Sequence, residues 1–497
     1  MATSTLLVAL AALCSAPSSA ASPDEARDIA AFKRAFGAGR PTAASLEEKR
    51  QTLAAMAAHD SAKVVRALVV GYTILEREAA ALEEKRRPLL EQLGGKKLLP
   101  FRLELKPIRA LQGTIIERLL AARDPDAVRS QVKLLLKRRS GLPFSVRAVF
   151  AATATRLSDQ DRRLVLDAKG KRRPVQDIAL LLDAIGSLEK RGADAGPWVV
   201  RMLAHKDPLV RERAAHALSR LRWPGSLQPL VARLAVEDGR MRARLGRTLE
   251  QLTGMKLGTS GAAWKRWLDQ EGGPFMNGEK PLGGHESTVT AEAAGGYYFG
   301  IPQDGRSILY VYDNSQSMKQ KLHQETDKDG NPVTRQARAR KELLAALDQL
   351  KPHQRFNIVA FANRLDRLDR RMQTATTANV ARAKQWVQEL KLRFGTNTYD
   401  ALELAFNTAG RGAFDQFYAL EADTVFLLSD GLPMIQKIKG GGVNPDAIEE
   451  ILAGVRRWNP FGRIVVHTIG LGLKRKRPRR FMRNLAEQNG GRFVEPK

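Results

Sequence analysis

The first half of the chain has the hydrophobic periodicity of helices. Between residues 24 and 270, apolar side chains recur at intervals of three and four, as from Ile178 through Leu181 and Leu182 to Leu188. Such spacing gives a helix one apolar face, which must be buried against another helix. The pattern predicts an all-helical region, with one long helix over Lys63–Arg87 that stops at Pro88. Further helix breaks are expected at Lys106-Pro107, Asp124-Pro125, Gly141–Pro143, Gly196-Pro197, Asp207-Pro208 and Pro224-Gly225.

A repeat runs through this helical region. Asp207 and Arg211 share the pattern Asp-x-x-apolar-Arg with Asp238 and Arg242, and Arg147 lies close to two further periods upstream. Helix pairs that recur at such a period stack into a solenoid. The pattern resembles HEAT repeats, best over residues 174–253. The resemblance implies that the Asp opens the second helix of each pair and that the Arg lies along it.

The repeats are expected to end in a short helix that Ser260 caps. Trp264 and Trp267 lie three residues apart, on one face of this helix. We expect them to form a hydrophobic lid on the last repeat. Residues 271–304 are rich in Gly, Pro, Ser and Thr without helical periodicity, which indicates a linker between two domains.

From residue 305 onward, continuous apolar segments alternate with amphipathic ones. The expected strands are Ser307–Tyr312, Phe356–Phe361, Thr424–Ser429, Arg463–Leu471 and Gly491–Val494. The expected helices are Arg335–Leu350, Thr377–Leu390, Asp400–Thr408, Pro445–Arg457 and Arg479–Gln488. This alternation predicts an α/β doubly wound fold with a mainly parallel sheet, covered by helices on both faces.

Polar residues follow the strands of this predicted sheet. Asp313, Ser315 and Ser317 come at the end of the first strand, Asp430 comes after the third, and Thr396 leads into a helix. Ligands of such sheets bind at the carboxyl ends of the strands, so these residues are expected to converge. Two carboxylates and several hydroxyls, without sulfur or imidazole, suit a hard cation such as Mg²⁺, Mn²⁺ or Ca²⁺.

Asp-x-Ser-x-Ser followed by Thr and Asp resembles the metal-ion-dependent adhesion site of the von Willebrand factor A and integrin I family. The resemblance covers about residues 306–495 and implies that all five residues hold one divalent cation, most of all Mg²⁺. Ser315 and Ser317 would bind it through their hydroxyls, while Asp313 and Asp430 would act mostly through water. An open position on the cation would accept an Asp or Glu of a partner. Two residues depart from the family pattern: Gln316 stands where a small residue is common, and Asn314 is a less familiar choice beside Asp313.

Charge adds a second candidate surface. The chain has 82 Lys and Arg against 53 Asp and Glu, a formal charge of +29. A surface of this charge attracts polyanions. Because the basic residues are spread along the chain, they also fit the ordinary solvated faces of helices. No nucleic-acid-binding module accompanies this charge. The run Lys474–Arg480 should emerge at the metal face, either as a solvated loop or as a surface that steers an acidic partner. The partner-binding residues we expect are Gln316, Lys474, Arg475, Lys476 and Arg477.

Residues 1–20 have the features of a secretory signal peptide, with an apolar run over Leu6–Leu13 and small residues before Ala20. Cys14, the one cysteine, lies within this leader, so disulfides are not expected to stabilise the mature chain. No later segment has the roughly 18 uninterrupted apolar residues of a transmembrane helix. We therefore expect an exported protein, periplasmic or secreted.

Four segments result: a signal peptide (1–20), HEAT-like repeats (24–270), a linker (271–304) and a von Willebrand factor A domain (305–497). The favoured function is non-enzymatic: adhesion or scaffolding, in which the cation binds an acidic group of a protein partner and the repeats offer a second surface. One alternative is a metal-dependent hydrolase, although Asp313 and Asp430 are committed to the metal and leave no general base nearby. The other is a protein that binds polysaccharide or nucleic acid through charge alone. The motifs leave the oligomeric state open.

Overall fold

The computed structural model forms two compact units. One contains Met1–Glu83 and Leu103–Thr290, and the other contains Glu84–Arg102 and Ala291–Lys497. The structure describes residues 22–37, 43–93, 98–137, 141–170, 173–188, 192–237, 239–287, 296–326, 330–409, 421–431, 433, 446–459 and 462–496. The predicted leader with Cys14, and Asp238 of the repeat pattern, lie outside these residues.

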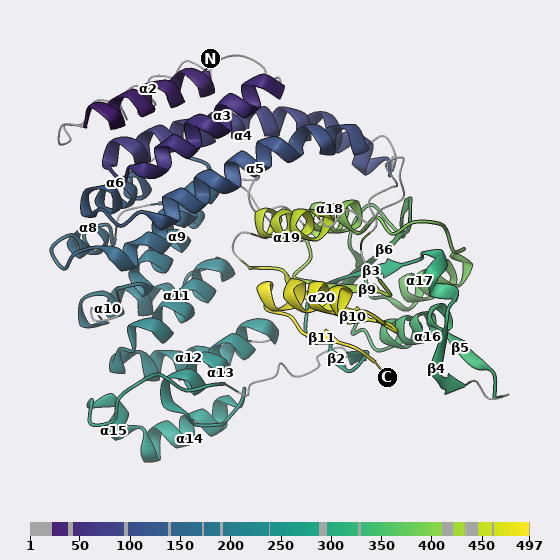
Figure 1. The fold of residues 1–497 in the computed structure, drawn as a ribbon. Helices are drawn as coiled ribbons and strands as arrows, with labels where there is room; N and C mark the ends of the chain where they lie inside the picture. Colours follow the sequence, from purple (N-terminus) through teal and green to yellow (C-terminus); the bar gives the residue numbers. More distant parts are fainter. Residues whose placement is uncertain are drawn as a thin grey trace. The chain divides into compact units, whose positions relative to one another are not determined.

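The first half of the chain is helical, as its periodicity predicts. Its helices are α2 (Pro23–Gly37), α3 (Ala43–Ala55), α4 (Ala62–Glu91), α5 (Leu99–Ala121), α6 (Pro125–Leu136), α7 (Phe144–Thr153), α8 (Arg162–Leu166), α9 (Val175–Gly186), α10 (Gly192–Met202), α11 (Pro208–Leu221), α12 (Leu227–Val236), α13 (Gly239–Thr253), α14 (Gly261–Glu271) and α15 (Gly273–Met276). They follow one another from purple to teal in Figure 1. Helix α11 packs between α9 and α13, and α12 packs against α13 and α14, as in stacked helix pairs. None of the helices in the described ranges is long and apolar enough to cross a membrane.

Three helices begin at side-chain caps, of which the one at Ser260 was predicted and the one at Asp207 fits the repeat pattern. The side chain of Asp124 accepts a hydrogen bond from the backbone of Ala127, and Asp207 caps α11 in the same way at 2.8 Å from the backbone nitrogen of Leu209. Ser260 caps α14. Each cap satisfies a backbone N–H that the first turn of a helix leaves without a partner. In α14, Trp264 and Trp267 are buried, with ring centroids 5.5 Å apart, which fits a hydrophobic lid.

Three proline positions differ from the prediction. Helix α4 continues past Pro88, and Pro107 and Pro197 lie inside α5 and α10, so the expected breaks at these prolines are wrong. A proline inside a helix removes one backbone hydrogen bond and typically costs ~3 kcal/mol. Packing offsets this cost, because the neighbouring Leu90 and Ile108 are buried and helices in proteins owe most of their stability to such contacts.

Ion pairs of the repeat arginines connect neighbouring segments of the helical region, one of them close to the predicted period. Arg147 donates a hydrogen bond to Asp177, 30 residues further along the chain. Arg211 lies 2.7 Å from a carboxylate oxygen of Glu237 and 3.0 Å from the backbone oxygen of His205. The arginine of the repeat pattern therefore ties its own helix to the next turn of the solenoid.

The second unit contains a seven-stranded sheet in the order β11-β10-β9-β3-β6-β7, with β8 also paired to β6. Its strands are β3 (Ser307–Asp313), β6 (Arg355–Phe361), β7 (Leu365–Arg367), β8 (Gln373–Thr374), β9 (Thr424–Ser429), β10 (Val465–Gly470) and β11 (Phe493–Val494). The five predicted strands are present and pair in parallel. The short strands β7 and β8 run antiparallel to β6. Two small hairpins accompany the sheet: β1 (Tyr297–Tyr298) with β2 (Ile301–Pro302), and β4 (Lys321–Thr326) with β5 (Pro332–Thr334).

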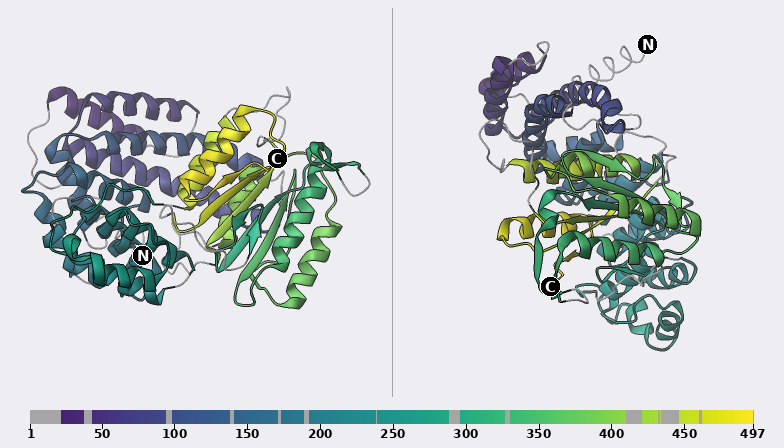
Figure 2. Two further views of the ribbon diagram at one scale, coloured as in Figure 1. Left: turned by 90° about the horizontal axis from the view of Figure 1, so that it is seen from below. Right: turned by 90° about the vertical axis from the view of Figure 1, so that its right-hand side faces the viewer.

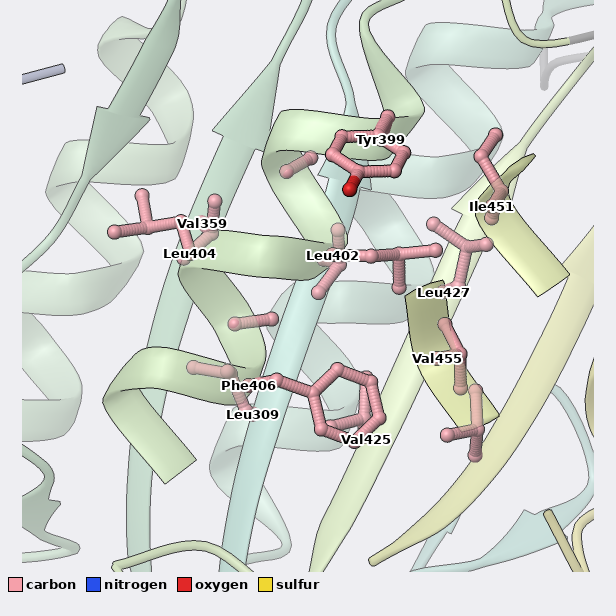
Figure 3. Close-up of a cluster of buried hydrophobic side chains, with 14 of the residues drawn as sticks. Leu309, Val359, Tyr399, Leu402, Leu404, Phe406, Val425, Leu427, Ile451 and Val455 are labelled. Atoms are coloured by element: carbon pink, nitrogen blue, oxygen red, sulfur yellow. The ribbon is translucent and has the colours of Figure 1, made fainter. Parts of the chain in front are cut away.

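Helices cover both faces of this sheet. They are α16 (Arg335–Asp348), α17 (Thr377–Glu389), α18 (Thr398–Ala409), α19 (Asp446–Trp458) and α20 (Lys476–Gln488). Leu309, Val359 and Leu427 point toward α18 and α19 (Figure 3), in one core cluster that also includes residues of α20. Ile308, Ile358 and Leu428, one position along each strand, face α16 and α17 in a second cluster. Figure 2 shows the helices on the two sides of the strands. The predicted doubly wound architecture is confirmed.

The segment Glu84–Arg102 packs with the sheet unit, although its helical periodicity placed it with the repeats. Leu90 and Leu98 belong to the core cluster of α18 and α19. The side chain of Arg86 lies 2.6 Å from Asp400 and also pairs with Glu403, and all three side chains are buried. Buried charges of opposite sign thus attach this segment to the start of α18.

Candidate metal centre

The sheet brings the ends of β3 and β9 together. The two strands pair in parallel, with Val311 opposite Leu427 and Tyr312 opposite Leu428. Asp313 ends β3, and Asp430 directly follows β9. Since parallel neighbours end at the same edge, both carboxylates lie at the carboxyl edge of the sheet, where doubly wound folds bind their ligands.

Hydrogen bonds link four of the five residues predicted for this site. The backbone nitrogen of Ser315 donates to Oδ1 of Asp313 at 2.9 Å. The hydroxyls of Ser315 and Ser317 are 2.9 Å apart, and the hydroxyl of Ser317 donates to Oδ1 of Asp430 at 2.9 Å. Two carboxylates and two hydroxyls therefore form one continuous group.

The carboxylates of this group are buried together. Asp313 is 0% exposed and Asp430 is 8% exposed. Burial, and then the nearby Asp430 charge, raise the pKa of Asp313 to about 7, although hydrogen bonds from Ser429 and Ser315 lower it. Ser429, which we did not predict, donates its hydroxyl to Oδ2 of Asp313 at 2.6 Å. Two close carboxylates in a buried place favour a cation between them.

Thr396 lies on a loop that backbone hydrogen bonds fix to the same edge. The backbone of Gln316 donates to Arg393, and the backbone of Asn363 donates to Phe394. Ser315 and Arg393 also form an isolated parallel bridge. The loop turns at Gly395, with φ at +82°, a conformation that glycine adopts without strain. Thr396 itself is buried, three residues after the bridge to the serine motif.

Asn314 holds this loop by its side chain. Its amide nitrogen donates to the backbone oxygen of Lys391 at 2.7 Å, and its backbone oxygen accepts from Arg393 at 3.0 Å. The unusual residue beside Asp313 thus connects the serine motif to the loop of Thr396. Gln316 is half-buried, and its backbone nitrogen bonds the same loop.

The basic run differs from its prediction. Lys474 and Arg475 lie in the turn after β10, but α20 begins at Lys476, so the rest of the run forms the first turn of a helix rather than a loop. Lys474, Arg475, Lys476 and Arg477 are all exposed. Pro478, the third residue of α20, is buried, and the first turn of a helix accepts proline because its N–H groups have no partner within the helix.

Arg335 was also missed, and it touches the site directly. It is the first residue of α16, and its guanidinium donates to Oδ2 of Asp430 at 2.7 Å. No spacing rule in the sequence connects it with the motif, because Arg335 follows the β4–β5 hairpin and reaches the site only through the fold.

The donor set of the site fits a hard divalent cation. It consists of carboxylate and hydroxyl oxygens, which are the ligands of Mg²⁺, Mn²⁺ and Ca²⁺ rather than of zinc in closed structural sites. Within the ranges that the structure describes, no group of three or more His, Cys, Asp or Glu side chains offers another metal site.

Both units match known families. Residues 330–494 match the von Willebrand factor type A domain, and residues 167–250 match HEAT repeats. The chain joins HEAT repeats to a von Willebrand factor A domain. This agrees with both resemblances that the motifs indicated. Thr396 and Asp430 lie within the matched residues, whereas Asp313, Ser315 and Ser317 precede them, at the end of the neighbouring strand β3 and just after it.

Two proteins of other organisms are similar to part of the chain. Inter alpha-trypsin inhibitor, heavy chain 4, of Mus musculus is 24% identical over 192 residues, which are 38% of this chain and 18% of that protein. The von Willebrand factor A domain-containing protein 3B of Homo sapiens is 24% identical over 194 residues, 38% of this chain and 13% of that protein. The chain thus matches less than a fifth of the length of either relative.

Two solved structures are similar to part of the chain at low sequence identity. A von Willebrand factor type A protein from Catenulispora acidiphila is 19% identical, covers 39% of this chain and 38% of its own, and has a TM-score of 0.28. Proximal thread matrix protein 1 from the mussel byssus, solved with a zinc-occupied MIDAS motif, is 19% identical over 38% of this chain and 41% of its own, with a TM-score of 0.25.

Proposed function

We propose that the von Willebrand factor A domain of this protein holds a divalent cation and uses it to bind an acidic side chain of a protein partner. Asp313, Ser315, Ser317, Thr396 and Asp430 would hold the cation, with Mg²⁺ favoured and Mn²⁺ or Ca²⁺ also suited to these oxygen ligands. The observation that carries the proposal is the hydrogen-bonded group of two buried carboxylates and two serine hydroxyls.

A cation at this site supplies Lewis acidity and an exchangeable position for a carboxylate of the partner. The chain's own residues then orient the partner. Gln316 is half-buried beside the serine motif, so it can contact the incoming side chain. Phe394 is 74% exposed, although its backbone is fixed by Asn363. An exposed aromatic ring on a fixed loop is a typical anchor for an apolar side chain, so we infer an acidic residue with an apolar neighbour in the partner.

The exposed basic residues Lys474, Arg475, Lys476 and Arg477 support the same kind of partner. Gly472, just before them, accepts a hydrogen bond from the side chain of Arg335, which itself touches Asp430. The backbone that leads into the basic run is therefore linked through Arg335 to Asp430. Positive charge around a binding site accelerates association with an acidic partner. An acidic polymer could use the same charge, and export through residues 1–20 would present the domain outside the cytoplasm.

Calorimetric titration of the full chain with Mn²⁺ tests the metal site. We expect one Mn²⁺ to bind the wild-type protein and binding to be lost in Asp313→Ala. Asp348→Ala is the matched control. Asp348 is an exposed residue of the same domain that pairs with Lys384, and its substitution removes an equal charge. Absence of Mn²⁺ binding to the wild type, or equal binding by Asp313→Ala, would show the proposal to be wrong.

The partner is sought by capture from the native source with the immobilised full chain, with and without EDTA. A partner that uses the cation is lost with EDTA and with Asp313→Ala. A ligand that stays bound in EDTA but dissociates with salt indicates binding by charge alone. For a captured partner, neutralising Lys474, Arg475, Lys476 and Arg477 should slow association and weaken its salt dependence; an unchanged association rate rules out the steering role.

A further inference from the structure

Arg335 places a positively charged side chain at the candidate metal centre. One nitrogen of its guanidinium lies 2.7 Å from Oδ2 of Asp430, and another lies 2.7 Å from the backbone oxygen of Gly472. The side chains of Arg335 and Asp430 are 5% and 2% exposed. Ser317 binds the other carboxylate oxygen of Asp430, so the arginine occupies one side of this carboxylate and leaves the side of the serine motif to other groups.

The surroundings of Arg335 are shaped to hold it. Gly472 has a φ of +59°, and a Cβ at this glycine would lie 2.7 Å from Nε of Arg335, so a larger residue would displace the guanidinium. Arg335 also begins α16, after the cap residue Thr334. A cation is unfavourable at the amino end of a helix, where the helix dipole is positive. A buried charge at this unfavourable helix position indicates that the contact with Asp430 is the reason for an arginine at residue 335.

The arginine changes the charge of the site. Asp313 and Asp430 together carry two negative charges when ionised, and Arg335 reduces the sum to one. A divalent cation then gives the loaded site a net positive charge, which a partner's carboxylate neutralises. Without the arginine, the cation alone would neutralise the site, and an incoming carboxylate would leave it negative. In a buried place of low effective dielectric constant, one unit of charge has a large effect on both steps.

We propose that Arg335 makes the cation and the partner's carboxylate bind as a pair: it weakens binding of the cation alone and strengthens binding of a carboxylate to the loaded site. This inference rests on the proposed metal-dependent function. It predicts that the domain holds its cation firmly only when an acidic ligand is present, which is positive coupling between the two ligands.

The test is Mn²⁺ titration of the full chain without a partner, for the wild type, Arg335→Gln and Arg335→Lys. Removal of the charge should tighten Mn²⁺ binding about tenfold or more, while Arg335→Lys should stay near the wild type. Arg338→Gln is the matched control, because Arg338 lies on the same helix and pairs with Glu342 instead. Tightening in Arg335→Lys as well would overturn the charge argument.

A second measurement uses acetate as the carboxylate probe, against chloride at equal ionic strength. In the wild type, acetate should tighten Mn²⁺ binding, and this effect should shrink in Arg335→Gln or, if that variant does not melt cooperatively, in Arg335→Met. The role of Arg335 is overturned if acetate has no effect in the wild type, or if a folded variant without the charge has unchanged Mn²⁺ affinity. Neither result contradicts the metal site itself. Absence of Mn²⁺ binding in every protein instead overturns the proposed function.

Discussion

At the scale of single residues, Asn314 decides how firmly the loop of Thr396 is held. Its side chain donates to the backbone oxygen of Lys391 at 2.7 Å. We expect Asn314→Ala to lower the free energy of unfolding of the domain by about 1 kcal/mol, the usual net value of one hydrogen bond. Mn²⁺ binding should weaken several-fold, because Thr396 is then less fixed. Urea unfolding and calorimetry measure the two effects.

The control for this prediction is Asn379→Ala. Asn379 also donates its side-chain amide to a backbone oxygen, that of Thr374, at 2.9 Å, but the bond is exposed. Water replaces an exposed hydrogen bond at little cost, so Mn²⁺ affinity should not change. Equal losses of affinity in both variants would contradict the positioning role of Asn314.

His216 gives the helical unit a pH dependence. Burial, and then the charges of Arg213, Arg244 and Arg220, lower the pKa of its imidazole to about 4, against about 6.5 in an unfolded chain. Between these values the unfolded state binds more protons, so stability falls as the pH falls. In the folded state Glu212 stays ionised in this window: burial raises its pKa, but the surrounding arginines lower it further, to about 2.

We therefore expect the free energy of unfolding of the helical unit to fall by roughly 1–2 kcal/mol between pH 7 and pH 5 through His216 alone. Urea unfolding of the full chain at pH 7, 6 and 5, followed by hydrogen exchange in α11 and α13, measures the effect. His216→Gln should show a smaller fall than the wild type. Parallel pH profiles for the two proteins would assign the pH dependence to other groups.

Some residues of the candidate site could be predicted from the sequence, and others could not. Asp313 and Asp430 follow apolar strands directly, so strand periodicity alone predicts their convergence. Arg335 and Ser429 carry no such signal: Ser429 reads as the last residue of a strand, and Arg335 as one of many basic residues on a helix. Side chains that reach a site across the fold depend on tertiary packing, which no local pattern specifies.

At the scale of elements, the ion pairs of Arg86 attach the segment Glu84–Arg102 to helix α18. Arg86, Asp400 and Glu403 have side chains at most 3% exposed. Removal of one partner from such a buried pair leaves an uncompensated charge and costs ~3–5 kcal/mol. We expect Arg86→Met to destabilise the second unit by this amount, measured by hydrogen exchange of α18 amides in increasing urea.

Two further variants distinguish the cost of an uncompensated buried charge from the loss of an exposed ion pair. Arg355→Met removes a pair with Glu421 whose side chains are 37% and 48% exposed, and exposed pairs contribute ~1 kcal/mol or less. Adding Glu403→Gln to Arg86→Met should restore part of the lost stability, because one buried negative charge is removed with its partner. No recovery in the double variant would contradict a charge-based attachment.

Elements that bury a long apolar face were predictable, and short or proline-containing ones were not. The five parallel strands and the helices between them match the sequence pattern closely. The breaks expected at Pro88, Pro107 and Pro197 are absent because packing outweighs the local preference of proline. Strands of two or three residues, such as β7 and β8, have too few positions to show an alternation.

At the scale of the whole molecule, the position of a segment in the sequence does not decide to which compact unit it belongs. The composition change near residue 271 indicated a boundary between helical repeats and sheet, and the compact units separate between residues 290 and 291. The segment Glu84–Arg102 nevertheless belongs to the sheet unit, because its buried arginines and leucines contact α18 and α19. Helical periodicity shows that a face is buried, but not against which partner.

This arrangement predicts where the effect of the metal extends in the full chain. Thr396 lies two residues before α18, and Asp400 of α18 pairs with Arg86. A ligand at 100 times its dissociation constant stabilises the native state by about 2.7 kcal/mol. We expect saturating Mg²⁺ to slow amide exchange in β3, β9, α18 and residues 84–93, and to leave α9–α13 unchanged. Asp313→Ala should show no change, and slowing in α9–α13 without slowing in residues 84–93 would contradict this path.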